Sequence, residues 1–501
     1  MLTQRADERI WGEAAMTKAL KLLTVMLLTT APVGVVVAQD GFVAPSVPSD
    51  SGRRTRTPEA QAILDASIAE EVREMKLLGI RQLRTPKNAT NPASPDFTNY
   101  DEAKANPFPN LPPLMKLADG TPVKTRAQWE KRRGEIKALF DSEIYGKYPA
   151  NIPGVSWSVE SVTEQEVEGV PAVVKRVIGR VDNSAYPGIE VVIKLDVVTP
   201  ASAKGKRVPM IVGPSLQTHP LLRGTFTQVP GSSMCLVLGP EVPQPQAQLL
   251  RKGWGFVSVN GSEVQPDNGA GLTKGIIGLV NKGQPRAMDD WGVLRAWAWA
   301  NSRALDYLLT DKDVDGARVG IMGHSRTGKS ALVTIVDDPR FAVGFISASG
   351  AGGANLYRRN YGEQPENVAA PNEYHWMAGN FLKYAAVGTS IDTLPVDSHQ
   401  FVALIAPRPV FIGGGDYIGD PPCAIPGDAW QDAHGMFLSA AAASPAWELL
   451  GAKGLGTGSF PVRETFINTG KVGFRQHPYG HTPNPNWSYF IQFADRQFAG
   501  K

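Results

Sequence analysis

The chain has 501 residues, of which 42% are hydrophobic and 20% are charged. This balance is typical of a globular protein and excludes a chain that is disordered along its whole length. Its 51 basic and 48 acidic residues give a formal net charge of +3. The charges are spread without a basic block, so nucleic-acid binding is not indicated.

The N-terminal region has the three-part layout of a secretory signal. Between residues 16 and 38, Lys18 and Lys21 precede an apolar segment that ends at a small residue. We predict that residues 1–38 are a signal peptide, with Met16 as the better start because the residues before it mix both charge signs. The mature protein is then periplasmic or secreted and has no membrane attachment. The alternative is a membrane anchor, which the shortness of the segment and its internal Thr, Pro and Gly residues disfavour.

Cys235 and Cys423 are the two cysteines of the chain. In an exported protein they either form one disulfide or stay reduced, and the sequence leaves both options open. No pair of histidines lies near them in the sequence, so they do not match the ligand pattern of a structural zinc site. We expect neither a metal nor a cofactor.

Residues 39–113 are rich in Pro, Ser, Thr and Asn. One segment in this region, residues 58–80, has apolar positions at helical spacing. We therefore expect an N-terminal extension with one helix, wrapped on a main domain that occupies residues 114–501. The main domain begins with a second amphipathic helix over residues 126–146.

The pattern then changes from helical to strand-like. Three segments alternate polar and apolar residues, as antiparallel strands with one wet face do, and they are residues 155–167, 171–181 and 189–200. Six short apolar runs follow, as expected of parallel strands that are buried on both faces, and they are residues 207–214, 254–260, 317–323, 341–349, 408–415 and 471–477. Helical stretches such as residues 289–311 separate several of these runs. The order predicts antiparallel strands that lead into a doubly wound, mostly parallel α/β sheet.

The glycine-rich stretch ARVGIMGHSRTGKS, residues 317–330, predicts a strand, a tight turn and a helix that opens at Ser330. From Gly323 the letters GHSRTG resemble the nucleophile elbow of an α/β-hydrolase, with Ser325 as the nucleophile. The second glycine comes one place late for G-x-S-x-G. The letters GHSRTGKS also match the phosphate-binding P-loop. A third interpretation is a glycine-rich turn without chemistry.

The position of this stretch in the chain favours the elbow. A P-loop normally follows the first strand of its domain, whereas Gly323 comes after several strands. An exported protein also rarely meets a nucleoside triphosphate, and no apolar run ending in an acidic residue stands out as a magnesium-holding partner strand. We therefore predict that Ser325 is a nucleophile.

A serine nucleophile of this kind needs an acid downstream and then a histidine after the last strand. His481 fits, because it lies between the predicted strand 471–477 and a predicted terminal helix over residues 487–498. His477 is the competitor. The predicted strand 408–415 leads into a segment with four candidate acids, which are Asp416, Asp420, Asp428 and Asp432.

Several motifs occur in a characteristic order, and they are NPFPNLP, WEKRRGEIKALFDSEIYG, DDWGVLRAWAWANSRALDYLLTD, GHSRTGKSAL, SGAGGANLYRRNYGE, DAWQDAHGMFLSA and GHTPNPNW. From about Asn106 onward, the chain therefore resembles the bacterial glucuronoyl esterases, a family of carbohydrate esterases. The resemblance implies an α/β-hydrolase fold with a three-layer sandwich. It also implies a serine esterase that hydrolyses the ester between 4-O-methyl-glucuronate on xylan and lignin alcohols.

Carried over motif by motif, the resemblance implies Ser325 as the nucleophile and His481 as the base. It implies Arg326 as a donor to the oxyanion, together with backbone amides. Three further residues would bind the glucuronate sugar, and they are Lys329, Glu363 and Trp430. The alternatives are an ordinary surface charge for the first two and a core aromatic for the tryptophan.

One position departs from the family pattern. Many family members have a catalytic Glu just before the SGAGG-type turn, where this chain has Ala348. The acid must then come from the segment after strand 408–415, and the D-x-W pattern assigns it to Asp428, with Asp432 as the runner-up. Two other functions stay open, namely a hydrolase of acetyl or other carboxylic esters and a non-catalytic carbohydrate-binding protein. We expect a monomer.

Overall fold

The computed structural model describes residues 42–46, 56–106, 110–214, 227–228, 235–236, 242–416 and 428–499. The predicted signal peptide lies outside these residues, as do Asp420 and the side chains of both cysteines, so those expectations stay predictions. None of the helices in the described part of the chain combines the length and the hydropathy that a bilayer crossing requires.

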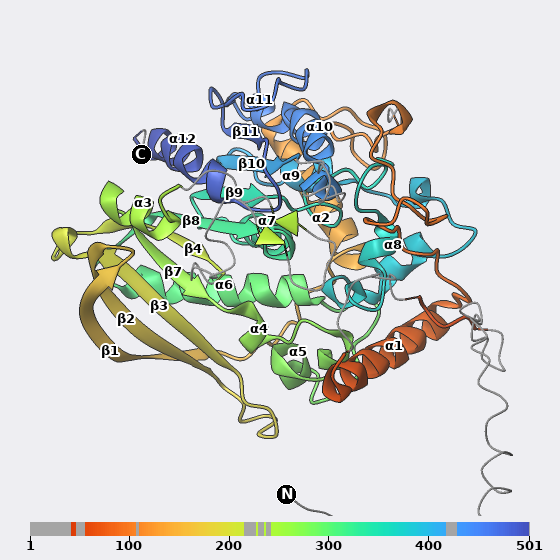
Figure 1. Cartoon of the computed structure of the whole chain (residues 1–501), viewed down its shortest axis with the longest axis horizontal. Helices are drawn as coiled ribbons and strands as arrows, with labels where there is room; N and C mark the ends of the chain where they lie inside the picture. The colour runs from red at the N-terminus through yellow and green to blue at the C-terminus, as the bar shows by residue number, and fades with distance from the viewer. Residues whose placement is uncertain are drawn as a thin grey trace, which may run out of the picture.

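A nine-stranded mixed sheet forms the centre of the molecule (Figure 1). At one edge, β1 (Val155–Val167), β2 (Val170–Val181) and β3 (Val192–Pro200) are antiparallel, and β3 pairs antiparallel with the next strand. The other six strands run parallel in the spatial order β7 (Gly255–Val259), β4 (Val208–Gly213), β8 (Val314–His324), β9 (Val343–Ser347), β10 (Val410–Gly415) and β11 (Val472–His477). All nine predicted strands are present, and the predicted α/β class is confirmed.

The parallel strands are mostly apolar because both faces of the sheet are covered. Neighbouring residues of one strand join different cores: Ile346 packs in the larger core with α6 (Val293–Thr310) and α7 (Arg326–Asp337), whereas Phe345 packs in the smaller one. The smaller core holds α3 (Pro245–Lys252) and α12 (Trp487–Phe498). This alternation with a period of two gives the three layers that the resemblance implied.

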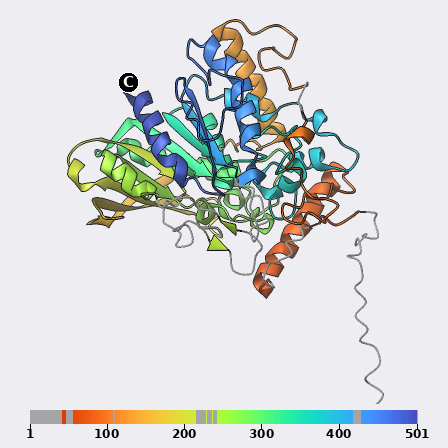
Figure 2. The same ribbon diagram turned by 45° about the horizontal axis from the view of Figure 1, so that its top comes forward.

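Helix α1 (Pro58–Leu78) lies along the periphery of the molecule in both Figure 1 and Figure 2. Thr57 caps its N-terminus, and Gly79 ends it in the left-handed conformation. The helix is fastened to the rest of the chain by a fully buried ion pair between Glu74 and Arg286, at 2.8 Å. Helix α2 (Arg126–Glu143) begins at a capping box and contributes its apolar stripe to the larger core. The division of the chain at residue 113 remains a prediction.

The remaining α-helices are short, apart from α10 (Ala433–Ala443), and they are α4 (Gly261–Val264), α5 (Gly275–Val280), α8 (Pro365–Val368), α9 (Ser398–Ala403) and α11 (Pro445–Leu449). Three short 3₁₀ turns matter for the site, and they are η1 (Glu102–Lys104), η5 (Tyr374–Trp376) and η8 (Asp428–Gln431). One sequence expectation was wrong: the helix after Gly323 begins at Arg326 and not at Ser330. The turn at Ser325 is so sharp that the chain enters the helix at the next residue.

Candidate active site

Ser325 occupies the turn between β8 and α7 with φ 57° and ψ −132°. A positive φ is strained for a residue with a side chain and costs on the order of 1–3 kcal/mol. The turn also needs its two glycines. A Cβ on Gly323 would lie 2.0 Å from the carbonyl oxygen of Thr327, and one on Gly328 would lie 2.7 Å from that of Ser347. Gly328, which comes one place late for the elbow pattern, therefore still allows the backbone of α7 to approach β9 closely. The turn presents Ser325 at the carboxyl edge of the sheet.

The geometry of Lys329 excludes the P-loop interpretation. Its buried ammonium donates to the carbonyl oxygens of Ser349 at 2.8 Å and Ala351 at 2.6 Å, and to Glu363 Oε2 at 2.7 Å. A lysine has three protons to donate, and all three are used inside the protein. A P-loop lysine must instead reach the phosphates of a nucleotide.

His481 and Asp428 are in direct contact. His481 Nδ1 lies 2.7 Å from Asp428 Oδ1, and the other carboxylate oxygen accepts a hydrogen bond from the backbone of Gly415. Asp428 is fully buried. Burial alone would raise its pKa, but the hydrogen bond from His481 and its histidine surroundings outweigh it and lower the pKa below the ordinary value. The ionised carboxylate only accepts, so Nδ1 must carry the proton and Nε2 is the free nitrogen of the neutral imidazole.

The imidazole of His481 packs against the elbow. Its ring centroid lies 4.3 Å from that of His324, the residue before Ser325. Nδ1 of His324 lies 3.0 Å from the hydroxyl of Ser347, and burial lowers the pKa of His324 to about 3. His324 is therefore neutral at ordinary pH, so it does not repel a positive charge that forms on His481.

The competing histidine is engaged elsewhere. Nε2 of His477 donates to the carbonyl oxygen of Thr482 at 2.9 Å, and its Nδ1 accepts from the backbone N–H of Tyr479 at 3.2 Å. With both ring nitrogens in local hydrogen bonds and the side chain fully buried, His477 has no nitrogen left for proton transfer.

The competing acids are engaged as well. Asp432 caps α10 by accepting from the backbone of Gly435 at 2.9 Å, and it pairs with Arg359 Nε at 2.7 Å. Asp416 pairs with Arg463 at 2.8 Å. Among the described candidates, Asp428 is the carboxylate bonded to His481.

Arg326 follows Ser325 directly and is held by a group that sequence reasoning missed. Its Nη1 donates to Asp267 Oδ2 at 2.7 Å, and its guanidinium lies 5.2 Å from the ring centroid of Trp376. The other oxygen of Asp267 accepts from Trp376 Nε1 at 2.6 Å and from His375 Nε2 at 3.0 Å. The only sequence signal at Asp267 is the turn-forming Asp-Asn-Gly, which predicts a loop and no partner.

Within the described ranges, no group of three or more His, Cys, Asp or Glu side chains is arranged to hold a metal ion. Acid, imidazole, hydroxyl and guanidinium come together at one edge of the sheet. This arrangement suits nucleophilic attack on a carbonyl carbon.

Comparison with known proteins identifies the family. The family model described as "Glucuronyl esterase, fungi" matches residues 286–451. The carbohydrate esterase MZ0003 of an unknown prokaryotic organism is 32% identical over 436 residues, which cover 81% of this chain and 94% of that protein. The chain belongs to the glucuronoyl esterase family.

A solved structure and a fungal relative agree with this membership. A family 15 carbohydrate esterase, the glucuronoyl esterase from Teredinibacter turnerae T7901, is 38% identical and superimposes with a TM-score of 0.76, covering 86% of this chain and all of that one. The 4-O-methyl-glucuronoyl methylesterase 1 of Sodiomyces alcalophilus is 33% identical over 172 residues, which cover 32% of each chain. The resemblance and the α/β-hydrolase fold are confirmed.

The three predicted sugar-binding residues of this glucuronoyl esterase lie together. Lys329 and Glu363 form a buried ion pair at 2.7 Å, so they are not ordinary surface charges. The backbone N–H of Glu363 donates to the carbonyl oxygen of Trp430 at 2.8 Å, and the Trp430 side chain is half-buried, unlike a core aromatic. Contact with a sugar stays a prediction, and a sugar that bonds Lys329 directly would have to displace one of its present partners.

Ala348 stands where many glucuronoyl esterases have the acid, and the structure brings this position close to Asp428. A Cβ placed on Gly414 would lie 3.3 Å from Asp428 Oδ2 and 3.7 Å from the Cα of Ala348. The two positions thus flank the same glycine of β10. The usual position of the acid and the one used here are therefore neighbours in space.

Proposed function

We propose that this protein is a serine-type glucuronoyl esterase that hydrolyses the esters linking 4-O-methyl-glucuronate on glucuronoxylan to lignin alcohols. The observation that carries the proposal is the 2.7 Å contact between His481 and the buried Asp428, beside the strained turn of Ser325. The names of the relatives point to the same ester class.

In the first half of the reaction, the Ser325 hydroxyl attacks the ester carbonyl carbon while His481 Nε2 takes its proton. The negative charge that develops on the carbonyl oxygen is met by the guanidinium of Arg326 and by free N–H groups at the start of α7. His481 then returns the proton to the leaving alcohol, and the glucuronoyl group stays bound to Ser325 as an ester.

In the second half, water attacks this acyl-enzyme. His481 takes a proton from the water and returns it to Ser325 Oγ, which releases the glucuronic acid and restores the resting state. Asp428 holds the imidazole in the tautomer that leaves Nε2 free, and its charge stabilises the imidazolium in both halves.

The decisive experiment compares wild type with Ser325→Ala on benzyl glucuronate and on an acetylated sugar. We expect hydrolysis of the glucuronate ester by wild type alone, and labelling of wild type by a fluorophosphonate at Ser325. Faster turnover of the acetylated sugar would move the protein to the broader class of carboxylic-ester hydrolases. Binding of glucuronate without product would instead indicate a carbohydrate-binding protein.

We also propose that the protein is exported to the periplasm or the medium and acts as a monomer. The support is the layout of residues 16–38, with its basic start and apolar centre. Mass spectrometry of the protein recovered from its native compartment should give an N-terminus near Gln39. Light scattering should give the mass of one mature chain, and an intact N-terminus in a membrane fraction would contradict export.

A further inference from the structure

A cavity of about 440 Å³ lies next to the candidate active site and has no part in the mechanism above. The ends of β10 and β11, the first turn of α10, the segment before β11 and η1 of the N-terminal extension form its walls. Its lining includes Glu102, Tyr361, Asp416, His434, Phe460 and Arg463.

Two segments belong both to this cavity and to the catalytic apparatus. In η8 and the start of α10, Asp428 contacts His481, whereas Ala429 and Asp432 line the cavity. In the 361–363 segment, Tyr361 lines the cavity, whereas Glu363 pairs with the lysine of the predicted sugar site. The cavity therefore adjoins the catalytic apparatus across these two segments.

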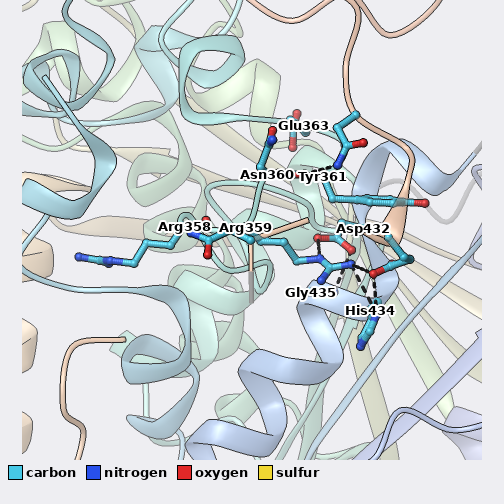
Figure 3. Close-up of polar contacts among 12 residues, drawn as sticks. Arg358, Arg359, Asn360, Tyr361, Glu363, Asp432, His434 and Gly435 are labelled. Atoms are coloured by element: carbon cyan, nitrogen blue, oxygen red, sulfur yellow. Dashed lines mark hydrogen bonds and ion pairs between the residues drawn. The ribbon is translucent and has the colours of Figure 1, made fainter. Parts of the chain in front are cut away.

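A network of ion pairs forms the inner wall of the cavity. Figure 3 shows Arg359 directed toward Asp432 and His434, while the neighbouring Arg358 points the opposite way. Arg359 pairs with Asp432 at 2.7 Å and also with Glu102, which lies 3.2 Å from His434 Nδ1. Hydrogen bonds from His434 and Arg359 lower the pKa of Glu102 to about 2 against the opposing effect of burial.

Arg463 pairs with Asp416 in the same way, so both guanidinium groups at the cavity are already paired with carboxylates. No excess of positive charge is left among the described lining residues to attract a second uronate or a phosphate. The ligand that fits this balance is uncharged.

The lining also carries the groups that bind a ring with hydroxyls. His434 and Phe460 stack with their ring centroids 4.1 Å apart and 20° between their planes, and both rings line the cavity. Beside it, Asp416 Oδ1 is buried and accepts no hydrogen bond, and Arg463 is 54% exposed. A sugar ring can pack on the aromatic side chains, donate a hydroxyl hydrogen bond to Asp416 and accept one from Arg463.

We propose that this cavity is a subsite for a neutral saccharide, and that it holds xylose units of the xylan chain to which the glucuronate is attached. The xylan part of this inference rests on the proposed function. The binding of a neutral sugar stands on the geometry of the cavity alone.

The first test compares two substrates that carry the same ester. One is benzyl glucuronate, and the other is the benzyl ester of a glucuronate carried on a xylo-oligosaccharide. We compare kcat/KM for the longer substrate with kcat/KM for the shorter one. In Phe460→Ala and in Arg463→Ala this ratio should fall about tenfold, which corresponds to a loss of roughly 1.4 kcal/mol of binding free energy. The fall should come from a higher KM for the longer substrate. Val462→Ala is the matched control, because Val462 lies in the same segment, is 83% exposed and does not line the cavity.

The second test needs no ester chemistry. Xylotetraose titrated into Ser325→Ala by calorimetry should bind, and adding Arg463→Ala to that variant should weaken the binding about tenfold. Equal loss on both substrates in the first test, or no binding of xylotetraose, would overturn the subsite. If a lignin-like phenol displaces bound xylotetraose, the cavity would be assigned to the alcohol part of the ester, and the saccharide subsite would be overturned. If wild type leaves benzyl glucuronate intact while xylotetraose binds, the proposed esterase function fails and the saccharide site stands.

Discussion

Asp267 Oδ2 accepts a hydrogen bond from Arg326 Nη1 at 2.7 Å, across 59 residues of sequence. Burial favours the neutral acid, but the hydrogen bond and charge of His375, together with Arg326, hold the pKa of Asp267 far below its usual range. The guanidinium therefore faces a permanent negative charge and rests against the ring of Trp376. Its position is set before substrate arrives, which is the condition for electrostatic stabilisation of a transition state.

Arg326→Ala should lower kcat far more than it raises KM. The guanidinium meets charge that exists only in the transition state, and the loss of one such donor costs on the order of a hundred- to a thousand-fold in turnover. Steady-state kinetics on benzyl glucuronate measure both constants. An effect confined to KM would mean that Arg326 only holds substrate.

Asp267→Asn should lower kcat by about tenfold, because it keeps the size of the side chain but removes the charge that orients Arg326. The same substitution in the Arg326→Ala background should have little further effect on kcat, since there is no guanidinium left to position. A double-mutant cycle in kcat measures this coupling. Additive losses in the two variants would show that Asp267 acts on the fold and not through Arg326.

Asp428→Asn should reduce activity severely, because it removes the charge that favours imidazolium and can leave His481 in the wrong tautomer. The corresponding change in serine proteases costs roughly ten-thousand-fold. Asp432→Asn should cost much less activity, but it should lower the melting temperature because it breaks the buried pair with Arg359. Parallel kinetics and thermal unfolding separate the two effects. Near-full activity of Asp428→Asn would refute the assignment of the acid.

Installing a carboxylate by Ala348→Glu in the Asp428→Asn background should restore part of the lost activity. Both positions lie next to Gly414, so a glutamate at residue 348 would start close to the carboxylate site that Asp428 occupies. Ala348→Gln in the same background is the matched control and should restore nothing. Equal activity of the Glu and Gln variants would show that charge at this position does not reach the imidazole.

His477 should contribute a loss of stability as the pH drops from about 6.5 toward 4. Burial lowers the pKa of His477 to about 4, below the ordinary value of about 6.5 that the unfolded chain has. The unfolded state then binds more protons in this window, so the free energy of unfolding decreases by up to about 1.4 kcal/mol per pH unit for this residue. Urea unfolding at several pH values should show a shallower pH dependence for His477→Gln. Parallel profiles of wild type and variant would contradict the prediction.

The sequence by itself determined the fold and the chemistry that follows the order of the chain. The strands could be predicted from alternating polar and apolar residues or from short apolar runs, because burial on one or on both faces of a sheet selects those patterns. Gly323, Ser325 and His481 could be placed because an elbow needs glycine at a close approach and because the histidine follows the last strand. The D-x-W resemblance singled out Asp428 among four candidates, and the contact with His481 agrees with it.

Only the tertiary structure decided which distant side chains meet. The stretch that begins at Gly323 matched the P-loop pattern in full and the elbow pattern with one glycine a place late, and the burial of Lys329 against Glu363 decided between them. The partner of Arg326 comes from a loop that carries no periodic signal, and the cavity joins η1 of the N-terminal extension to the first turn of α10. Such contacts depend on how loops converge at the carboxyl edge of the sheet. Local propensity and periodicity report the environment of each segment, whereas pairing between segments is set by the packing of the whole chain.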